Sequence, residues 1–157
     1  MSRREIVRPP RRLRRVLHAT DFSSASRAAF RMAVGLAVRE RASLMLLHVL
    51  TPPSPFAPPR GAAASSYLAL LQAAQRQARL GLAAALTRAR AAGARVRVRL
   101  VEGDPADEIL KLGQSWRADL IVIGTHGRGA VSRFFMGSVA EHVVRRASRP
   151  VLTVRGR

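Results

Sequence analysis

The stretch Ser43–Leu50, SLMLLHVL, is apolar along almost its whole length. A strand that packs against helices on both faces needs apolar side chains on both, so this run predicts a buried strand of a parallel sheet. Three more strands are predicted from apolar runs, RVLHAT at 15–20, ADLIVIG at 118–124 and PVLTV at 150–154. In RVRVRL at 95–100, arginine alternates with an apolar residue. This pattern predicts an edge strand with Val96, Val98 and Leu100 on its buried face.

Two helices are predicted before the edge strand. Ser23 or Ser24 can cap a helix in which apolar residues recur at helical spacing up to Ala37. The segment 63–92 is rich in strong helix formers, with Gly93 placed to end it and Gly81 as a candidate break. The proline-rich segment 51–61 between the second strand and this helix predicts a surface loop.

Two further helices follow the edge strand. Asp104 as N-cap and Pro105 at the first helical position predict a helix that ends near Trp116, and 138–147 predicts the fourth. Strands and helices therefore alternate throughout the chain. This order predicts one α/β domain, a doubly wound five-stranded parallel sheet with four helices of the Rossmann-like kind.

The charge is strongly positive, because 28 lysines and arginines face 9 acidic residues and leave a formal net charge of +19. Such a balance favours nucleic acid or another polyanion as partner. Lys111 is the only lysine and alanine is abundant, so a compositional bias explains the arginines equally well. The arginine row on 95–100 likewise fits either a polyanion site or the protection of a sheet edge. Any binding of nucleic acid is expected to be nonspecific.

The amino-terminal segment 1–12 is basic and has no apolar core of a signal peptide. We expect it to be a flexible tail, followed by the domain at 13–157. No stretch is long and apolar enough to span a bilayer, and there is no cysteine. These features predict a cytoplasmic protein with no membrane partner.

Ligands of such folds bind outside the carboxyl ends of the strands. At that edge the chain carries Gly124-x-x-Gly127, nine further residues and then Gly137-Ser138 at the start of a helix. Bare backbone and a helix N-terminus both suit an anion such as phosphate. The chain lacks a Walker A loop and the glycine fingerprint of dinucleotide sites. Asp119 begins its strand and is expected at the opposite edge.

The segment ADLIVIGTHGRGAVSRFFMGSVAEHVVRRASRPVLTV resembles the carboxyl-terminal signature of the universal stress protein family, and VLHATDFSSAS resembles its opening strand and helix. The glycine spacing is similar to that of the family's ATP-binding branch. The resemblance implies a nucleotide site. Its residues would be Ala19, Thr20, Asp21, Val49, Ile123, Gly124, His126, Gly127, Arg128, Gly137, Ser138, Val139 and Ala140.

The resemblance also implies a nucleotide-dependent sensor or switch in the stress response. ATP, or AMP or ADP, would be the ligand, with Mg2+ bound through the phosphates. The protein would pair as a homodimer through its last strand and act on an unknown downstream protein. Two alternatives stay open, a basic scaffold for a polyanion that makes little use of the pocket, and a slow ATPase.

The remaining chemistry in the sequence is sparse. His18 and His48 lie in strand runs and are expected to be packed core residues. His126 is expected to line the pocket rather than to act as an acid or base, so no catalytic residue is assigned. No two histidines have the spacing of metal ligands, and no protein metal site is expected.

Overall fold

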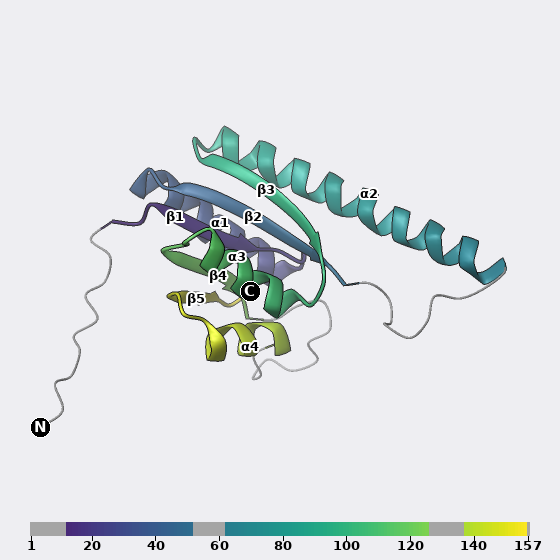
Figure 1. Ribbon diagram of the computed structural model, residues 1–157. Helices are drawn as coiled ribbons and strands as arrows, with labels where there is room; N and C mark the ends of the chain where they lie inside the picture. Colours follow the sequence, from purple (N-terminus) through teal and green to yellow (C-terminus); the bar gives the residue numbers. More distant parts are fainter. Residues whose placement is uncertain (1–11, 52–61, 126–136, 157) are drawn as a thin grey trace, which may run out of the picture.

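The computed structural model describes residues 12–51, 62–125 and 137–156 of the chain. Its five strands form one parallel sheet in the order β3-β2-β1-β4-β5 (Figure 1). The prediction of a doubly wound sheet with four helices is confirmed. The strands are β1 (Arg15–Ala19), β2 (Ser43–Leu50), β3 (Arg95–Glu102), β4 (Leu120–Gly124) and β5 (Val151–Val154). The helices are α1 (Ser24–Glu40), α2 (Ala62–Ala91), α3 (Pro105–Ser115) and α4 (Ser138–Arg146).

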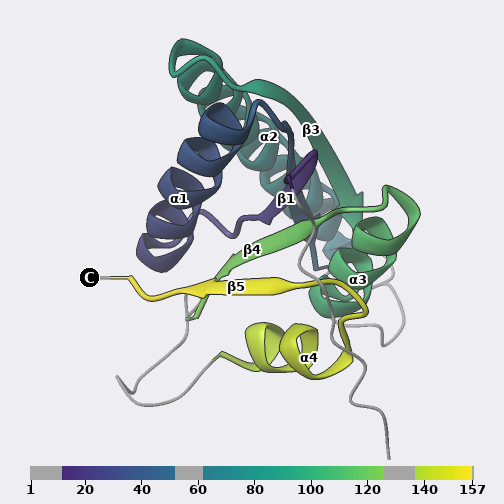
Figure 2. The same ribbon diagram turned by 90° about the vertical axis from the view of Figure 1, so that its left-hand side faces the viewer.

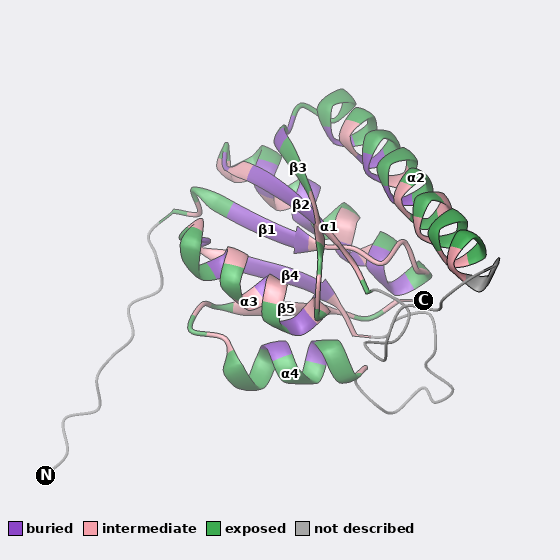
Figure 3. Ribbon diagram, turned by 45° about the vertical axis from the view of Figure 1, so that its right-hand side comes forward, coloured by how far each residue is buried: buried purple, intermediate pink, exposed green. Residues whose placement is uncertain are grey.

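The helices form two layers, with α1 and α2 on one face of the sheet and α3 and α4 on the other (Figure 2). Neighbouring residues of one strand therefore enter different cores. Val16 and Leu46 belong to the core beneath α1 and α2, whereas Leu17 and Leu47 belong to the core beneath α3 and α4. Burial on both faces explains why the central strands read as unbroken apolar runs, and Figure 3 shows these strands as the most buried part of the sheet.

The edge position of β3 is confirmed, because β3 pairs with β2 alone. Val96 is buried as predicted, but Val98 is 37% exposed. An edge strand has a neighbouring strand on one side only, so the helix layer covers its outer part incompletely. The side chains of Arg95, Arg97 and Arg99 are all exposed along this strand.

The predicted helix starts are confirmed at two positions. Ser23 Oγ accepts a hydrogen bond from Ser26 N at 3.2 Å, and Asp104 Oδ1 accepts one from Asp107 N at 3.0 Å. The predicted break at Gly81 is wrong, because α2 runs through it without interruption. A Cβ at Gly81 would lie 2.6 Å from Cζ of Phe22, so this glycine makes room for an aromatic ring.

Three helices end at the amino edge of the sheet with the same backbone hydrogen bond, from an N–H just past the helix to the carbonyl five residues before it in the last turn. These bonds join Ala42 N to Ala37 O, Ala94 N to Ala89 O and Ala118 N to Gly113 O. The residue before each donor has left-handed backbone. It is Gly93 after α2, with φ of 88°, but Arg41 after α1 and Arg117 after α3, with φ of 53° and 54°.

No described helix is both long enough and apolar enough to cross a membrane.

Candidate functional site

The order of the strands reverses between β1 and β4, and this is where an open parallel sheet forms its ligand crevice. From β1 the chain continues into α1 on one face, and α4, which follows β4 in the chain, covers the other (Figure 2). Ala19 ends β1 at this edge, Thr20 and Asp21 follow it, and Ile123 and Gly124 end β4. The structure thus brings the two predicted parts of the site to adjacent strands.

Thr20 organises the loop after β1. Its backbone N donates to Leu47 O at 2.8 Å, and its Oγ1 accepts from Ser26 Oγ at 2.6 Å and from Phe22 N at 3.1 Å. Asp21 Oδ1 accepts from Ser23 N at 3.0 Å. These bonds fix the Asp21 carboxylate at the edge of the sheet, directly before the start of α1.

His48 of β2 supports this loop from the neighbouring strand. Its Nδ1 lies 2.7 Å from Thr20 O, and because a carbonyl only accepts, Nδ1 carries the proton. The Phe22 ring packs on the imidazole with centroids 4.6 Å apart. His48 is thus packed as predicted, but it is only partly buried and adjoins the site instead of lying in the core. Val49 follows it and is also partly buried.

Gly124 has a packing role that its sequence motif did not reveal. A Cβ at this position would lie 2.8 Å from the backbone carbon of Ala25 in α1, too close for any other residue without a shift. Gly156 approaches the same residue, with its added Cβ 2.7 Å from Ala25 Cα. The bare backbone of Gly124 therefore serves the close approach of α1, whereas the sequence alone suggested contact with an anion.

The start of α4 lies beside the end of β4. Gly137 N donates to Thr125 O at 2.6 Å, which connects the two ends of a segment whose middle lies outside the described residues. Gly137 is the N-cap, and no side chain of the described residues caps the helix. The first N–H groups of a helix lack intrahelical partners, so those of Ser138, Val139 and Ala140 form an electropositive end suited to an anion.

Ten of the thirteen predicted site residues thus lie on four segments at one edge of the sheet, at the ends of β1, β2 and β4 and at the start of α4. The other three, His126, Gly127 and Arg128, lie outside the described residues, and their assignment stays a prediction. Sequence reasoning missed Ser26 and His48, which hold Thr20. The local signal for His48 was a polar side chain near the end of an apolar strand, and that for Ser26 was a polar side chain in the first turn of a helix.

The acidic residues near this edge already accept hydrogen bonds. Glu102 Oε1 accepts from Gln75 Nε2 at 2.9 Å, and Asp104 caps α3. Within residues 12–51, 62–125 and 137–156, no three His, Cys, Asp or Glu side chains cluster in a way that could hold a metal ion.

His18 lies within β1 and is fully buried, as predicted. Its Nδ1 is 2.9 Å from Val122 O, to which it donates. Burial lowers the pKa of His18 from 6.5 to about 4, against smaller opposing effects of this hydrogen bond and of the Asp21 carboxylate. The side chain is therefore neutral at physiological pH, and its Nε2 is buried without a partner among the described residues.

The comparisons with known proteins agree with this architecture. The sequence profile of the universal stress protein family matches residues 12–155. The chain belongs to the universal stress protein family. A universal stress protein of Methanocaldococcus jannaschii is 43% identical to it over 63 residues, which are 40% of this chain and 37% of that relative. The chain thus matches well under half the length of this curated relative.

Solved structures of the family share the whole fold. A universal stress protein from Lactobacillus plantarum superposes with a TM-score of 0.84 at 27% identity, over 93% of this chain and 100% of the other. A universal stress protein crystallised in complex with cAMP superposes with a TM-score of 0.63 at 29% identity, over 93% of this chain and 99% of the other. The resemblance inferred from the sequence is confirmed at the level of family and fold.

Proposed function

We propose that this universal stress protein binds an adenine nucleotide, ATP or else AMP or ADP, at the carboxyl edge between β1 and β4. The observation that carries the proposal is the 2.6 Å bond from Gly137 N to Thr125 O, which holds the uncapped start of α4 against the end of β4. A phosphate group there would receive N–H donors and the positive end of the helix dipole. The relative that was crystallised with cAMP supports the choice of an adenine nucleotide.

The site residues take roles according to their segment. Those after β1 would contact the adenosine, Val49 would meet the adenine through its backbone, and those at the start of α4 would hold the phosphates. The fixed carboxylate of Asp21 lies at the edge where a ribose hydroxyl could donate to it. Mg2+ would be held chiefly by phosphate oxygens, as is usual for this ion in nucleotide sites.

The proposed role is a nucleotide-dependent switch in the cytoplasm rather than an enzyme with rapid turnover. Fast phosphoryl transfer needs a positioned water, a metal clamp and groups that stabilise the transferring phosphate. We expect slow hydrolysis at most. The downstream partner would read a surface that differs between the free and the nucleotide-bound protein.

The proposal is tested by calorimetry with ATP, AMP and cAMP on the purified protein and on Ser138→Asp. An acidic residue in the first turn stabilises a helix but repels phosphate. We expect micromolar affinity for at least one nucleotide, about −8 kcal/mol. Ser138→Asp should lose roughly tenfold or more of it while melting at an equal or higher temperature. Gln114→Glu, on an exposed position of α3, is the control for the change in net charge.

Unchanged affinity in Ser138→Asp would place the phosphates elsewhere, and no binding of any of the three nucleotides would refute the site. A radiolabelled ATP assay separates the switch from the slow ATPase, because turnover of several molecules per minute would contradict the proposal of a mere switch.

We also propose a homodimer that forms through β5, which lies at an edge of the sheet and presents a strand side open to pairing. Sedimentation velocity gives the mass directly. A monomer at concentrations well above those used for binding would refute this arrangement.

A further inference from the structure

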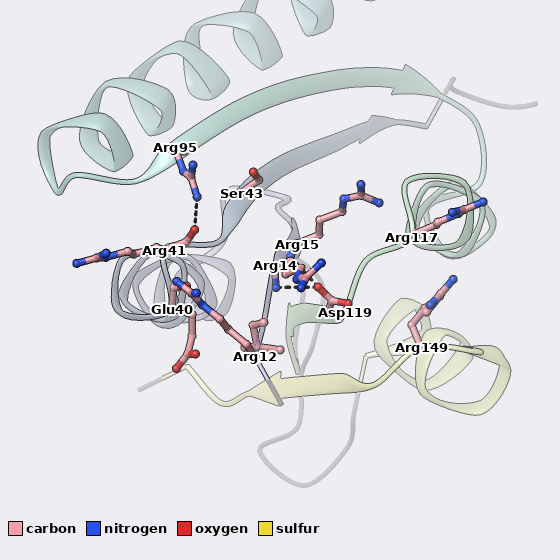
Figure 4. Close-up of a pocket in the computed structure, with 11 residues that line it drawn as sticks. Arg12, Arg14, Arg15, Glu40, Arg41, Ser43, Arg95, Arg117, Asp119 and Arg149 are labelled. Carbon is pink, nitrogen blue, oxygen red and sulfur yellow. Dashed lines mark hydrogen bonds between the residues drawn. The ribbon is translucent and has the colours of Figure 1, made fainter. Parts of the chain in front are cut away.

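A cavity lies at the amino edge of the sheet, at the opposite ends of the strands from the proposed nucleotide site (Figure 4). Its volume is about 680 Å³. Among the described residues, seven arginines line it against one glutamate and one aspartate, which leaves a formal charge of +5. The arginines come from separate parts of the chain, among them Arg41 after α1, Arg95 in β3, Arg117 after α3 and Arg149 before β5. Folding therefore brings together a basic cluster that no local sequence motif predicts.

The two carboxylates of the cavity are engaged by other groups. Asp119 Oδ2 accepts from Arg14 N at 2.8 Å and from Arg15 N at 2.9 Å. Glu40 Oε1 lies 3.3 Å from Nε of Arg39, which does not line the cavity. In the part of the chain that the structure describes, none of the four ion pairs includes a cavity arginine. Beyond the two carboxylates already counted, no ion pair among the described residues offsets the charge of +5.

Backbone carbonyls at helix ends hold three of the guanidinium groups. Arg12 Nε donates to Glu40 O at 3.3 Å, Arg15 Nη1 donates to Trp116 O at 3.0 Å, and Arg95 Nη2 donates to Arg41 O. Each of these groups keeps further N–H donors, since a guanidinium carries five. Part of the cluster is therefore oriented before any ligand arrives, which reduces the entropy that binding would cost.

Two of the arginines occupy positions where the backbone favours glycine. Arg41 and Arg117 have left-handed φ, and Gly93 takes the equivalent position after α2 at the same edge. Glycine adopts this conformation freely, whereas a residue with a Cβ is disfavoured there. Glycine would end these helices more easily, so the termination of the helices does not explain why both positions carry arginine.

We propose that this cavity binds a chain of linked phosphate groups, as in inorganic polyphosphate. The planar guanidinium fork matches phosphate oxygens in bidentate pairs, and several such groups around one concavity suit an anion with closely spaced charges. Sites for single-stranded nucleic acid add aromatic side chains on which bases stack, and none of the described residues that line the cavity is aromatic. Duplexes are read by elements that project into a groove, whereas this edge is hollow.

The test is calorimetry with inorganic tripolyphosphate at an ionic strength of about 0.15 M. Arg117→Gly/Arg149→Gln removes two guanidinium groups from different segments, and glycine suits the left-handed backbone at 117. We expect this variant to lose roughly tenfold or more of the affinity, as for hydrogen bonds between charged groups. Arg76→Gln/Arg79→Gln removes the same charge from exposed positions of α2 and should lose less than about twofold, since a distant surface charge is screened.

Arg117→Lys/Arg149→Lys keeps the charge and replaces the fork by a point charge, so a partial loss is expected. This pair also tests the proposal if the first variant proves unstable. Equal losses in the cavity variant and in the α2 control would mean that only net charge matters, and would overturn the proposal.

Ser138→Asp separates the two edges, because the amino-edge site should retain tripolyphosphate in that variant. If Ser138→Asp abolishes binding and Arg117→Gly/Arg149→Gln does not, the phosphates occupy the nucleotide site and the cavity proposal fails. Duplex DNA and poly-glutamate are titrated in parallel. Tighter binding of either, lost in the cavity variant, would assign the cavity to another class of polyanion and overturn the choice of polyphosphate.

Discussion

Acidification should destabilise the protein through His18. The folded state holds this side chain neutral with a pKa of about 4, whereas its ordinary pKa of 6.5 applies once the chain unfolds. Between these values the unfolded chain binds more protons than the folded protein, so stability falls as the pH falls from about 6.5 to about 4. The difference between the two pKa values corresponds to about 3 kcal/mol in total, and to about 2 kcal/mol at pH 5.

Urea denaturation at pH 7 and at pH 5 measures this loss, with His18→Leu as the matched protein that cannot titrate at position 18. The other three histidines are present in both proteins, so their contribution cancels in the comparison. We expect the wild type to lose about 2 kcal/mol more than His18→Leu between the two pH values. Equal losses in the two proteins would refute the conclusion that burial keeps His18 neutral.

Three further results are expected. Gly124→Ala should lower the free energy of unfolding in urea by about 1–3 kcal/mol, because the added Cβ meets the Ala25 backbone. Gly35→Ala, which has open space around its Cβ, should raise it by about 0.5–1 kcal/mol. Equal effects of the two substitutions would contradict the contact between Gly124 and Ala25. Asp104→Ala should lower the free energy of unfolding by about 1 kcal/mol through loss of the α3 cap, and no change would mean that the bond to Asp107 N contributes nothing. Duplex DNA should bind nonspecifically, with a salt slope of about −0.9 per phosphate neutralised, and selective binding that survives physiological salt would favour a nucleic-acid role.

An element of the fold could be predicted wherever a local sequence pattern is compatible with only one kind of structure. Continuous apolar runs identified the central strands because both of their faces are buried. Ser23 and Asp104 identified helix starts because their side chains replace missing backbone acceptors. Val98 and Gly81 were misjudged because their surroundings depend on distant elements, the missing neighbour of β3 and the ring of Phe22.

In the candidate site, too, the features set by local sequence were predictable and those set by distant contacts were not. Glycine spacing and strand order were enough to expect Gly124 and Gly137 at one edge, and the structure brings their segments together. The contact between Gly124 and α1 was not predictable, because it depends on the packing of a helix about a hundred residues away in the chain. The basic cavity was hidden for a similar reason, since Asp119 and its surrounding arginines meet only through the parallel arrangement of the strands.

The shortness of β1 has a practical consequence for measurements with anions. Five residues at about 3.3 Å each place the two edges of the sheet roughly 16 Å apart. This separation is about twice the Debye length at physiological salt but only about half of it near 0.01 M. The repulsion between anions at opposite edges should therefore be screened at the ionic strength of the cell and appreciable in dilute buffer. A titration at low salt would then show apparent antagonism between nucleotide and polyphosphate even if no residue of the protein moved.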